Sequence, residues 1–268
     1  MIEPSGCEEL VYLDVLLPVR APAPWLSETL IGLRNQTRKD WTLLGVIHES
    51  SLSTAVEILE FFPGAQIIEV SDEFTLPQSL SAGIESSTAE YIARIDSDDV
   101  PLPTRFEIQS AYLDEAPEVA LVTSPIELID ENGHSLGFSH RHPTGDLRKN
   151  LLRKNVIAHP AVMFRREAIM AVGGYSLDAL HGEDYELWLR LAAGQQELHT
   201  LEEPLTQYRL HDKQITATRA MNSSGRQAIR SARRRLGQEL GVSQVSVAAL
   251  NLLWTVRQQG RALMRSDG

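Results

Sequence analysis

One short stretch limits what this chain can fold into more than any other: a predicted strand that runs directly into a cluster of carboxylates. Residues 91–95 are mostly apolar and rich in β-formers, which is typical of a buried strand, and Asp96, Asp98 and Asp99 follow at its end. Three carboxylates so close together repel one another unless a cation lies between them. Ligands of open α/β sheets bind beyond the carboxyl ends of the strands, so a divalent cation carrying a phosphorylated ligand fits this position.

The same carboxylates have a second interpretation in which they only shape the backbone. Asp98 or Asp99 is a suitable cap for a helix that begins near Pro103, because aspartate is a common N-cap and proline a common first-turn residue. The stretch taken alone supports the cation site and the helix cap about equally.

The first hundred residues alternate between predicted strands and predicted helices. Thr54 and Glu57 match a capping box at the start of one of these helices. The predicted strands are 13–19, 41–47, 65–70 and 90–95, and the predicted helices are 25–33, 54–61 and 78–85. Such alternation predicts βαβ units and a parallel sheet. The segment contains no Gly-x-Gly-x-x-Gly and no Walker loop, which leaves a dehydrogenase or a kinase without support.

The pattern is no longer βαβ after residue 100. A strong turn signal at 130–133 separates two β-like arms, and a helix that follows Gly182 ends at Gly194. The other predicted elements are a helix at 103–115, strands at 119–123, 126–129 and 161–164, a helix at 166–172, an extended stretch at 195–209 and two helices after residue 218.

Length and composition indicate a globular protein. A chain of 268 residues that is 43% hydrophobic can bury a full core. The single cysteine, Cys7, excludes an intramolecular disulfide. The N-terminus lacks the regions of a signal peptide, and no apolar run approaches the roughly 20 residues that a spanning helix needs. We therefore expect a cytoplasmic protein.

The charge is distributed unevenly along the chain. The net charge of −11 argues against nucleic-acid binding. Residues 219–268 carry nine arginines against two acidic residues, a net of +7, which leaves −18 on the first 218 residues. This asymmetry predicts an acidic globule with a basic C-terminal extension.

Several motifs, in order and correctly spaced, resemble the family 2 inverting nucleotide-sugar glycosyltransferases, which share the glycosyltransferase A fold. The resemblance covers roughly residues 13–211. The motifs are Leu16-Leu17-Pro18-Val19 with the helix from Leu30 through Asn35-Gln36-Thr37, Glu90 to Asp99, His159-Pro160 through Gly173-Gly174-Tyr175, Gly182 to Arg190, and Pro204 to His211.

The resemblance implies an α/β fold with a Rossmann-like, mostly parallel central sheet, helices on both faces and a C-terminal helical extension. It implies a catalytic domain at 1–218, with a nucleotide-sugar half at about 11–100 and an acceptor half at about 101–218, followed by the extension at 219–268. The implied activity is hexosyltransferase-like: an inverting, metal-dependent transfer of sugar from a nucleoside-diphosphate sugar to a hydroxyl of a saccharide or lipid-linked acceptor in cell-surface polysaccharide synthesis.

The resemblance also assigns donor-site residues. Asp98 is the candidate direct ligand of Mg²⁺ or Mn²⁺, Asp96 contacts the nucleotide ribose or the water shell of the metal, and His211 is a third candidate ligand. Pro18, Val19 and Glu49 are the remaining candidates for nucleotide-sugar binding.

Two departures from the family pattern concern the donor. His48-Glu49 stand where the family has paired aspartates, so a base contact survives but a preference for UDP-sugars, although favoured, is not assured. Leu80-Ser81 stand where the family often has an arginine that contacts phosphate, which leaves phosphate neutralisation more to the metal.

In the acceptor half, the resemblance assigns Asp184 as the catalytic base and Glu183 and His159 as acceptor-binding residues. Each has a simpler interpretation. Acidic residues in the first turn of a helix are stabilised by its dipole, and a histidine before Pro160 is expected more often to pack than to bind.

Two other functions compete with the transferase. The first is a non-catalytic module that keeps the fold and binds a sugar nucleotide or carbohydrate, which retention of the acidic cluster and Glu183-Asp184 disfavours. The second is a nucleotidyltransferase, which would need a Gly-rich basic loop after the first strand that Pro18 to Pro22 does not provide.

The basic extension also has two interpretations. Val245, Ala248, Leu252 and Val256 form an apolar stripe that we expect to pack on the domain, while the arginines of the preceding helix offset its negative charge. The alternative is peripheral attachment to the inner face of the plasma membrane through arginines and stripe together.

Overall fold

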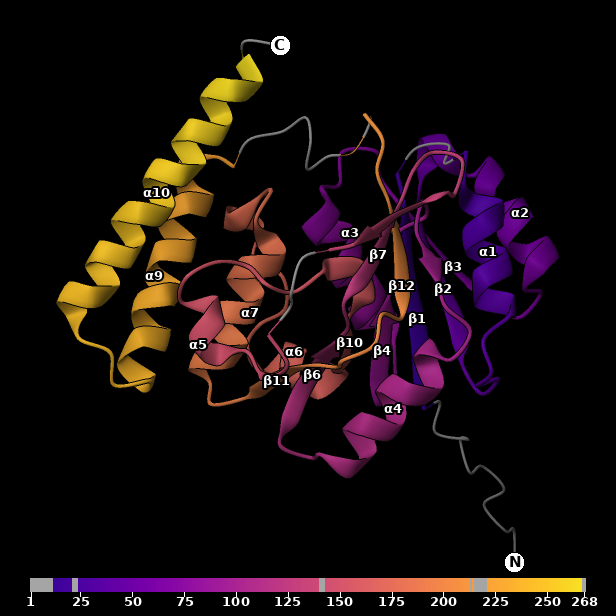
Figure 1. Ribbon diagram of the computed structural model, residues 1–268. Coiled ribbons are helices and arrows are strands. Elements are labelled where there is room, and N and C mark those ends of the chain that lie inside the picture. Colours follow the sequence, from indigo (N-terminus) through magenta and orange to yellow (C-terminus); the bar gives the residue numbers. More distant parts are fainter. Residues whose placement is uncertain (1–11, 21–23, 140–142, 213, 215–220, 267–268) are drawn as a thin grey trace, which may run out of the picture.

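The computed structural model describes residues 12–20, 24–139, 143–212, 214 and 221–266, and an eight-stranded sheet forms its centre (Figure 1). The strands lie in the order β3 (Gln66–Val70), β2 (Thr42–His48), β1 (Leu13–Val19), β4 (Tyr91–Arg94), β10 (Met163–Arg165), β6 (Val119–Thr123), β11 (Glu197–Thr200) and β9 (Gly145–Asp146). Only β10 and β9 run against the others. The predicted mostly parallel sheet is therefore confirmed. The boundary between residues 218 and 219, like Cys7, lies outside the described residues.

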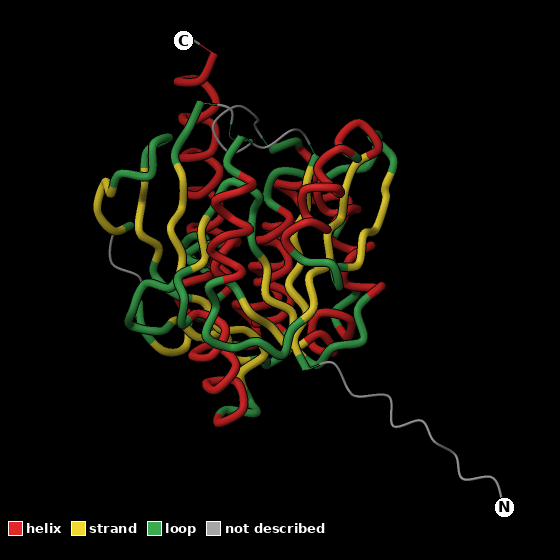
Figure 2. The backbone as a smooth tube through the Cα atoms, turned by 90° about the vertical axis from the view of Figure 1, so that its right-hand side faces the viewer, coloured by secondary structure: helices red, strands yellow, loops and turns green. Residues whose placement is uncertain are grey.

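Helices cover both faces of this sheet, because its strands are apolar on both sides. Along β1, Leu13, Val15 and Leu17 face one buried core, and Leu16 faces the other. The first core is completed by α1 (Leu26–Arg34), α2 (Ser53–Phe61) and α4 (Arg105–Glu115). The second is completed by α3 (Leu76–Ser86), α5 (Arg148–Leu151), α6 (Arg166–Ala171), α7 (Glu183–Ala193), α9 (Ser223–Glu239) and α10 (Gln244–Ser266). The result is a three-layer α/β/α arrangement, and Figure 2 shows the strands with helices packed around them.

A smaller four-stranded sheet joins distant parts of the chain, in the order β5 (Val100–Pro101), β12 (Thr206–Arg209), β7 (Ile126–Ile129) and β8 (Ser135–Phe138). The turn at 130–133 connects β7 to β8 as an antiparallel hairpin, as predicted. β12 lies between β5 and β7 and pairs with both, so a segment more than a hundred residues away in sequence closes onto the strand that directly follows Asp99.

The C-terminal helices pack into the same core as the sheet. Ile229 and Leu236 of α9 are fully buried in the core that contains α7, and Trp254 of α10 joins them. Arg233 is buried as well, and its Nε donates to the carbonyl oxygen of Leu152 at 2.9 Å. The extension is thus continuous with the hydrophobic core.

The apolar stripe of α10 faces outward, which corrects the expectation that it packs on the domain. Val245, Leu252 and Val256 are exposed, and α10 packs through Val247 and Trp254 instead. α10 is apolar on more than one side, so its sequence pattern alone does not identify the buried side.

The predicted capping box at Thr54 is also wrong. The 3₁₀ turn Glu49–Ser51 runs straight into α2, which begins at Ser53 without a side-chain cap, and the Thr54 hydroxyl donates to the Ser51 carbonyl at 2.6 Å. The capping box of this half lies at α3, where the side chain of Gln78 accepts from the backbone N–H of Thr75 at 2.8 Å.

Because α9 is part of the core, Leu236→Ala should lower the free energy of unfolding by about 2–5 kcal/mol, as large-to-small substitutions of buried leucine do. Leu252→Ala on α10 is the matched control, since 66% of Leu252 is exposed, and should change stability little. Urea denaturation of both variants measures the difference. Equal stability of the two variants would contradict the packing of α9.

Candidate donor and acceptor site

The parallel strands bring the sequence-predicted donor residues to one edge of the sheet. Pro18 and Val19 end β1, Glu49 directly follows β2, and Asp96 and Asp98 follow β4. β1 lies between β2 and β4 and is parallel to both, so all three carboxyl ends meet. Val19 is buried and Glu49 is exposed.

The acidic cluster is compact and differs in burial from one carboxylate to the next. Asp96, Asp98 and Asp99 each offer a carboxylate oxygen, and these atoms lie within 4.8 Å of one another. Asp99 is fully buried, whereas the side chains of Asp96 and Asp98 are partly exposed. Burial raises the pKa of Asp96 to about 6, against the opposing effect of Arg94. Burial and the neighbouring Asp98 raise the pKa of Asp99 well above its ordinary value.

The contacts of Asp99 do not support the helix-cap interpretation. Its Oδ1 accepts a hydrogen bond from the backbone N–H of Arg209 at 2.9 Å, across from β12. α4 begins at Arg105 with no side-chain cap. The buried Oδ2 of Asp99 has no partner among the described residues, an uncommon situation that points to a ligand outside the protein.

Arg209 holds the backbone of the acidic loop. Its guanidinium is fully buried and donates through Nε to the carbonyl oxygen of Asp98 at 3.0 Å. Nη2 contacts the Glu28 carboxylate of α1 at 2.6 Å, and Nη1 donates to the carbonyl of Asp130 at 3.1 Å in the β7–β8 turn. The loop is therefore fastened to both flanking elements. Complete burial excludes a role for Arg209 as a solvated surface charge.

His211 reaches the acidic cluster from the segment after β12. Its Nε2 lies 2.9 Å from Oδ2 of Asp98, and its ring packs against Trp25 with centroids 4.6 Å apart. Carboxylate and imidazole groups are suitable ligands for Mg²⁺ or Mn²⁺, with imidazole the weaker match for Mg²⁺. Together with the unpartnered oxygen of Asp99, this donor set fits a divalent cation.

Asp184 lies in the first turn of α7 and is partly exposed. Its Oδ2 accepts a hydrogen bond from Nδ2 of Asn155 at 2.7 Å. Burial and the adjacent Glu183 raise the pKa of Asp184 to about 6. Glu183 itself is buried, and its Oε2 accepts from the backbone N–H of Gly182 at 2.9 Å. Asn155 was not foreseen, because a lone asparagine in a polar loop carries no sequence signal.

His159 lies among aromatic side chains, and within the described residues it forms no hydrogen bond or ion pair with Asp184. Its Nε2 is 2.7 Å from the hydroxyl of Tyr175, and its ring meets that of Trp188 edge-on at 5.7 Å. Burial and the charge of Arg94 lower the pKa of His159 well below its usual value, so the imidazole is neutral. These surroundings fit the packing interpretation.

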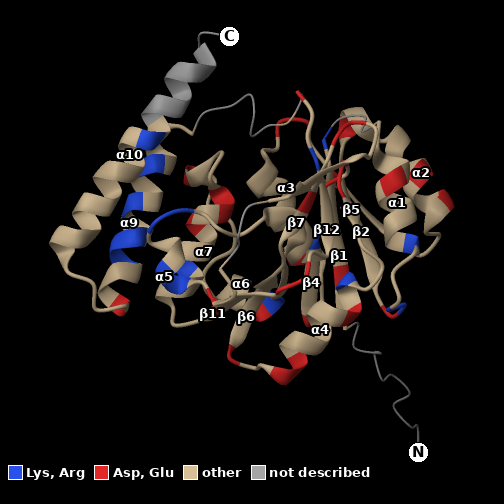
Figure 3. Cartoon of the chain, in the orientation of Figure 1, with Lys and Arg blue, Asp and Glu red and all other residues tan. Residues whose placement is uncertain are grey.

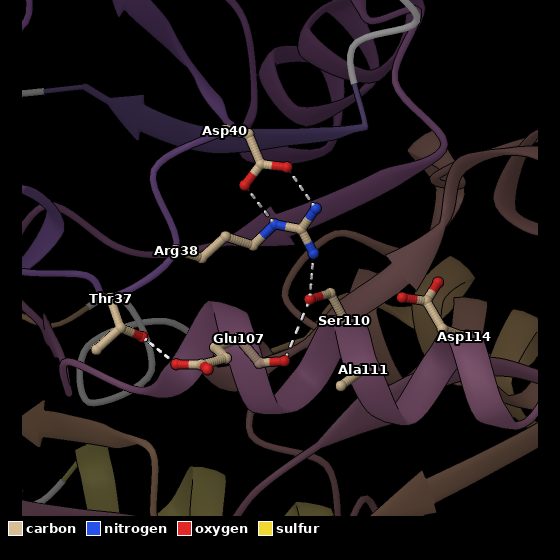
Figure 4. A pocket seen from close by; sticks show the side chains of 7 residues that line it. All are labelled: Thr37, Arg38, Asp40, Glu107, Ser110, Ala111 and Asp114. Atoms are coloured by element: carbon tan, nitrogen blue, oxygen red, sulfur yellow. Dashed lines mark hydrogen bonds and ion pairs between the residues drawn. The ribbon is translucent and has the colours of Figure 1, made fainter.

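A separate polar hollow lies near the amino end of β2, and Figure 4 shows the side chains that line it. It is formed by the segment before β2 and one side of α4. Within it, Arg38 is already paired, with the Asp40 carboxylate at 2.7 Å and the Ser110 hydroxyl at 2.6 Å. The cation of this hollow is therefore already paired within it.

Comparison with known proteins agrees with this geometry. Residues 14–173 match the model of glycosyl transferase family 2. The chain is 30% identical over 201 residues to the amylovoran biosynthesis glycosyltransferase AmsE of Erwinia amylovora, which covers 74% of this chain and 75% of the relative. It is 28% identical to the O-antigen biosynthesis glycosyltransferase WbnJ of Escherichia coli, over 76% of this chain and 82% of the relative.

Among solved structures, S. aureus TarS residues 1–349 with UDP-GlcNAc superposes with a TM-score of 0.66 at 13% identity, covering 89% of this chain and 69% of that one. This likeness concerns the fold. The match to the family model over more than half of the chain, with the similarity to AmsE, shows the family: the chain belongs to glycosyl transferase family 2 and is a nucleotide-sugar glycosyltransferase with the glycosyltransferase A fold.

Proposed function

We propose that this chain transfers a hexose from a nucleoside-diphosphate sugar to a hydroxyl of a saccharide or lipid-linked acceptor, with inversion, in the synthesis of a surface polysaccharide. The observation that supports the proposal most is that the chain has both the carboxylate cluster of Asp96, Asp98 and Asp99 and the partly exposed Asp184, whose pKa is raised. The similarity to AmsE and WbnJ supports the polysaccharide context. UDP-sugars are the favoured donors, because related structures hold UDP and UDP-GlcNAc.

On this proposal, Asp98 and Asp96 hold the divalent cation, with His211 as a further ligand and Asp99 behind them. When bound, such a cation offsets the negative charge of a departing nucleoside diphosphate. Pro18, Val19 and Glu49 bind the nucleotide. Asp96 contacts the ribose in addition to, or in place of, the metal.

Asp184 is the proposed general base. The acceptor hydroxyl attacks the anomeric carbon from the face opposite the leaving group and gives its proton to a carboxylate oxygen of Asp184. A single displacement inverts the anomeric centre and needs only one base. Glu183 orients this turn, and His159 supports the acceptor side through Tyr175.

Removal of the metal ligand tests the donor half. Asp98→Asn should abolish turnover and the dependence of UDP-sugar affinity on Mn²⁺, because the cation loses its principal ligand. Isothermal titration in Mn²⁺ and in EDTA measures this dependence for the wild-type chain and the variant. Equal donor affinity of the wild type in both buffers would refute a metal bound with the donor.

Asp184→Asn should lower kcat by about 10²–10⁴-fold while leaving donor affinity intact, since asparagine keeps the shape and removes only basicity. In the wild type, Asp184 must be ionised to act, so kcat/KM for the acceptor should rise through about pH 6 at saturating donor and metal. Asp178→Asn, an exposed neighbour, is the control. Near-normal turnover of Asp184→Asn would show that another residue is the base, and Glu183 would be the next candidate. Loss of turnover with intact donor binding would distinguish an enzyme from a non-catalytic binding module.

We further propose that the C-terminal helices attach the enzyme to an anionic membrane, where a lipid-linked acceptor is presented. Lys and Arg gather on α5 and α9 in Figure 3. Arg234 and Arg235 of α9 are exposed, and so are Leu252 and Val256 on the outer side of α10. Each arginine near an anionic surface contributes about 1 kcal/mol, which salt weakens. No helix within the described residues is long and apolar enough to cross a bilayer.

Point variants test the attachment, because deleting α9 would remove core residues. The triple variant Arg234→Gln, Arg235→Gln and Arg257→Gln should sediment several-fold less with phosphatidylglycerol vesicles at low salt. The control is the double variant Arg34→Gln and Lys39→Gln, which changes exposed residues at and just after the end of α1. It should sediment like the wild type. Failure of the wild type to bind anionic vesicles, or equal binding to neutral ones, would refute the proposal.

A further inference from the structure

Asn155 holds the carboxylate of Asp184 from outside the helix that carries it. It lies in the loop after α5, and its Nδ2 donates to Oδ2 of Asp184 at 2.7 Å across 29 residues of sequence. An aspartate in the first turn of a helix is stabilised by the helix dipole without any such partner. A donor supplied by a distant segment is therefore an additional constraint on this carboxylate.

The amide of Asn155 has one orientation that satisfies both of its neighbours. An asparagine amide carries an acceptor oxygen on one side and a donor nitrogen on the other. The Oδ1 atom accepts from the backbone N–H of Ile157 at 3.2 Å, which leaves Nδ2 to face Asp184. A donor in this position favours the ionised carboxylate, which only accepts hydrogen bonds.

The loop that carries Asn155 is itself fixed by the helices around it. The hydroxyl of Tyr185 in α7 donates to the carbonyl oxygen of Leu151 at 2.5 Å. In α9, Nε of Arg233 donates to the carbonyl oxygen of Leu152 at 2.9 Å. Both donor residues are buried. A donor can orient its partner only if the donor is rigid, and these contacts make it so.

A general base needs a carboxylate oxygen that is aimed at the proton it accepts. An aspartate side chain rotates about two bonds, and a free carboxylate is spread over several orientations. Anchoring one oxygen restricts both rotations before the acceptor hydroxyl arrives.

We propose that Asn155 is a positioning residue for the transfer, which anchors Oδ2 of Asp184 and keeps this carboxylate aimed at the acceptor hydroxyl. The inference rests on the proposed function, in which Asp184 is the base. It adds a residue that acts through the base without touching the substrate.

Other groups also act on the Asp184 carboxylate, and all of them remain when Asn155 is changed. Burial and Glu183 raise its pKa, whereas the backbone N–H of Tyr185, the amide of Asn155 and the charge of Arg94 lower it. Tyr175 lies within electrostatic range as well. A change in the titration of Asp184 in an Asn155 variant therefore reports the loss of one hydrogen bond.

Two variants separate the hydrogen bond from its charge. Asn155→Asp keeps the shape and the oxygen that accepts from Ile157, but replaces the donor with a negative oxygen. Asn155→Ala removes the donor without adding charge. The readout is a carbon-13 NMR titration of aspartate carboxyl groups, with the Asp184 signal assigned from Asp184→Asn. The midpoint should lie near pH 6 in the wild type. In both Asn155 variants it should rise toward about pH 7, because the ionised form has lost a donor.

Turnover is measured as UDP released from UDP-glucose, UDP-galactose and UDP-GlcNAc in Mn²⁺, with water as the acceptor. A bond forms between the water oxygen and the anomeric carbon, the bond to the diphosphate oxygen breaks, and the water proton passes to Asp184. At pH 6, kcat of each Asn155 variant should fall by about 10-fold or more. A smaller loss should persist at pH 8, where the carboxylate is ionised in every variant and only its orientation differs. Affinity for UDP should not change.

Asn150→Asp is the matched control, because it adds the same charge on α5, where the Asn150 side chain has no hydrogen bond among the described residues. It should behave like the wild type. An unchanged midpoint in Asn155→Ala would overturn the inference, and so would wild-type turnover of that variant at pH 8. The titration needs no substrate, so it decides the inference independently of turnover. Wild-type turnover of Asp184→Asn would instead refute the proposed base, and a wild type that binds none of these nucleotides would refute the proposed function itself.

Discussion

The structure depends on how negative charge is held at the carboxyl edge of the central sheet. Asp96, Asp98 and Asp99 follow one strand end, and a chain of net charge −11 cannot rely on distant cations to offset them. Two buried arginines act locally. Arg209 binds the backbone of the acidic loop, and Arg94 binds the carboxylate of Asp96. Among the described residues, neither arginine forms an ion pair with the carboxylate of Asp98 or Asp99, and this arrangement suits a divalent cation.

The small second sheet makes that arrangement rigid. β12 pairs between β5 and β7, and in doing so delivers the backbone N–H and the side chain of Arg209 to the acidic loop. The same strand places His211 beside Asp98. The acidic loop is thus closed by a segment from the 101–218 part of the chain, so the parts before and after residue 100 are joined by hydrogen bonds as well as by sequence.

The alternation of strands and helices, the parallel sheet and the hairpin at 130–133 could be predicted, because apolar periodicity and turn residues are local signals. The acidic cluster and Asp184 could be proposed as site residues from the sequence, because each lies in a motif of contiguous residues. The roles of Arg94 and Arg209 could not be predicted in the same way. Arginine is mostly exposed in proteins, and only pairings over more than a hundred residues, such as Arg209 with Asp98, reveal its burial. The prediction that the apolar stripe of α10 packs on the domain was wrong for a different reason: that helix has two apolar sides, and the sequence does not show which of them is buried.

The C-terminal helices also support the turn that carries Asp184. A Cβ at Gly182 would lie 2.2 Å from Cε of Met221 and 3.0 Å from Cδ1 of Ile229, so the segment leading into α9 packs directly against the start of α7. That turn carries Asp184, whose pKa is set by opposing effects. Burial and Glu183 raise it to about 6, whereas hydrogen bonds to the carboxylate lower it. The balance gives a carboxylate that is a stronger base than an ordinary aspartate and is still mostly ionised at neutral pH, which is what deprotonation of a hydroxyl requires. Because α9 supports this turn, the basic extension is part of the structure that holds the proposed base.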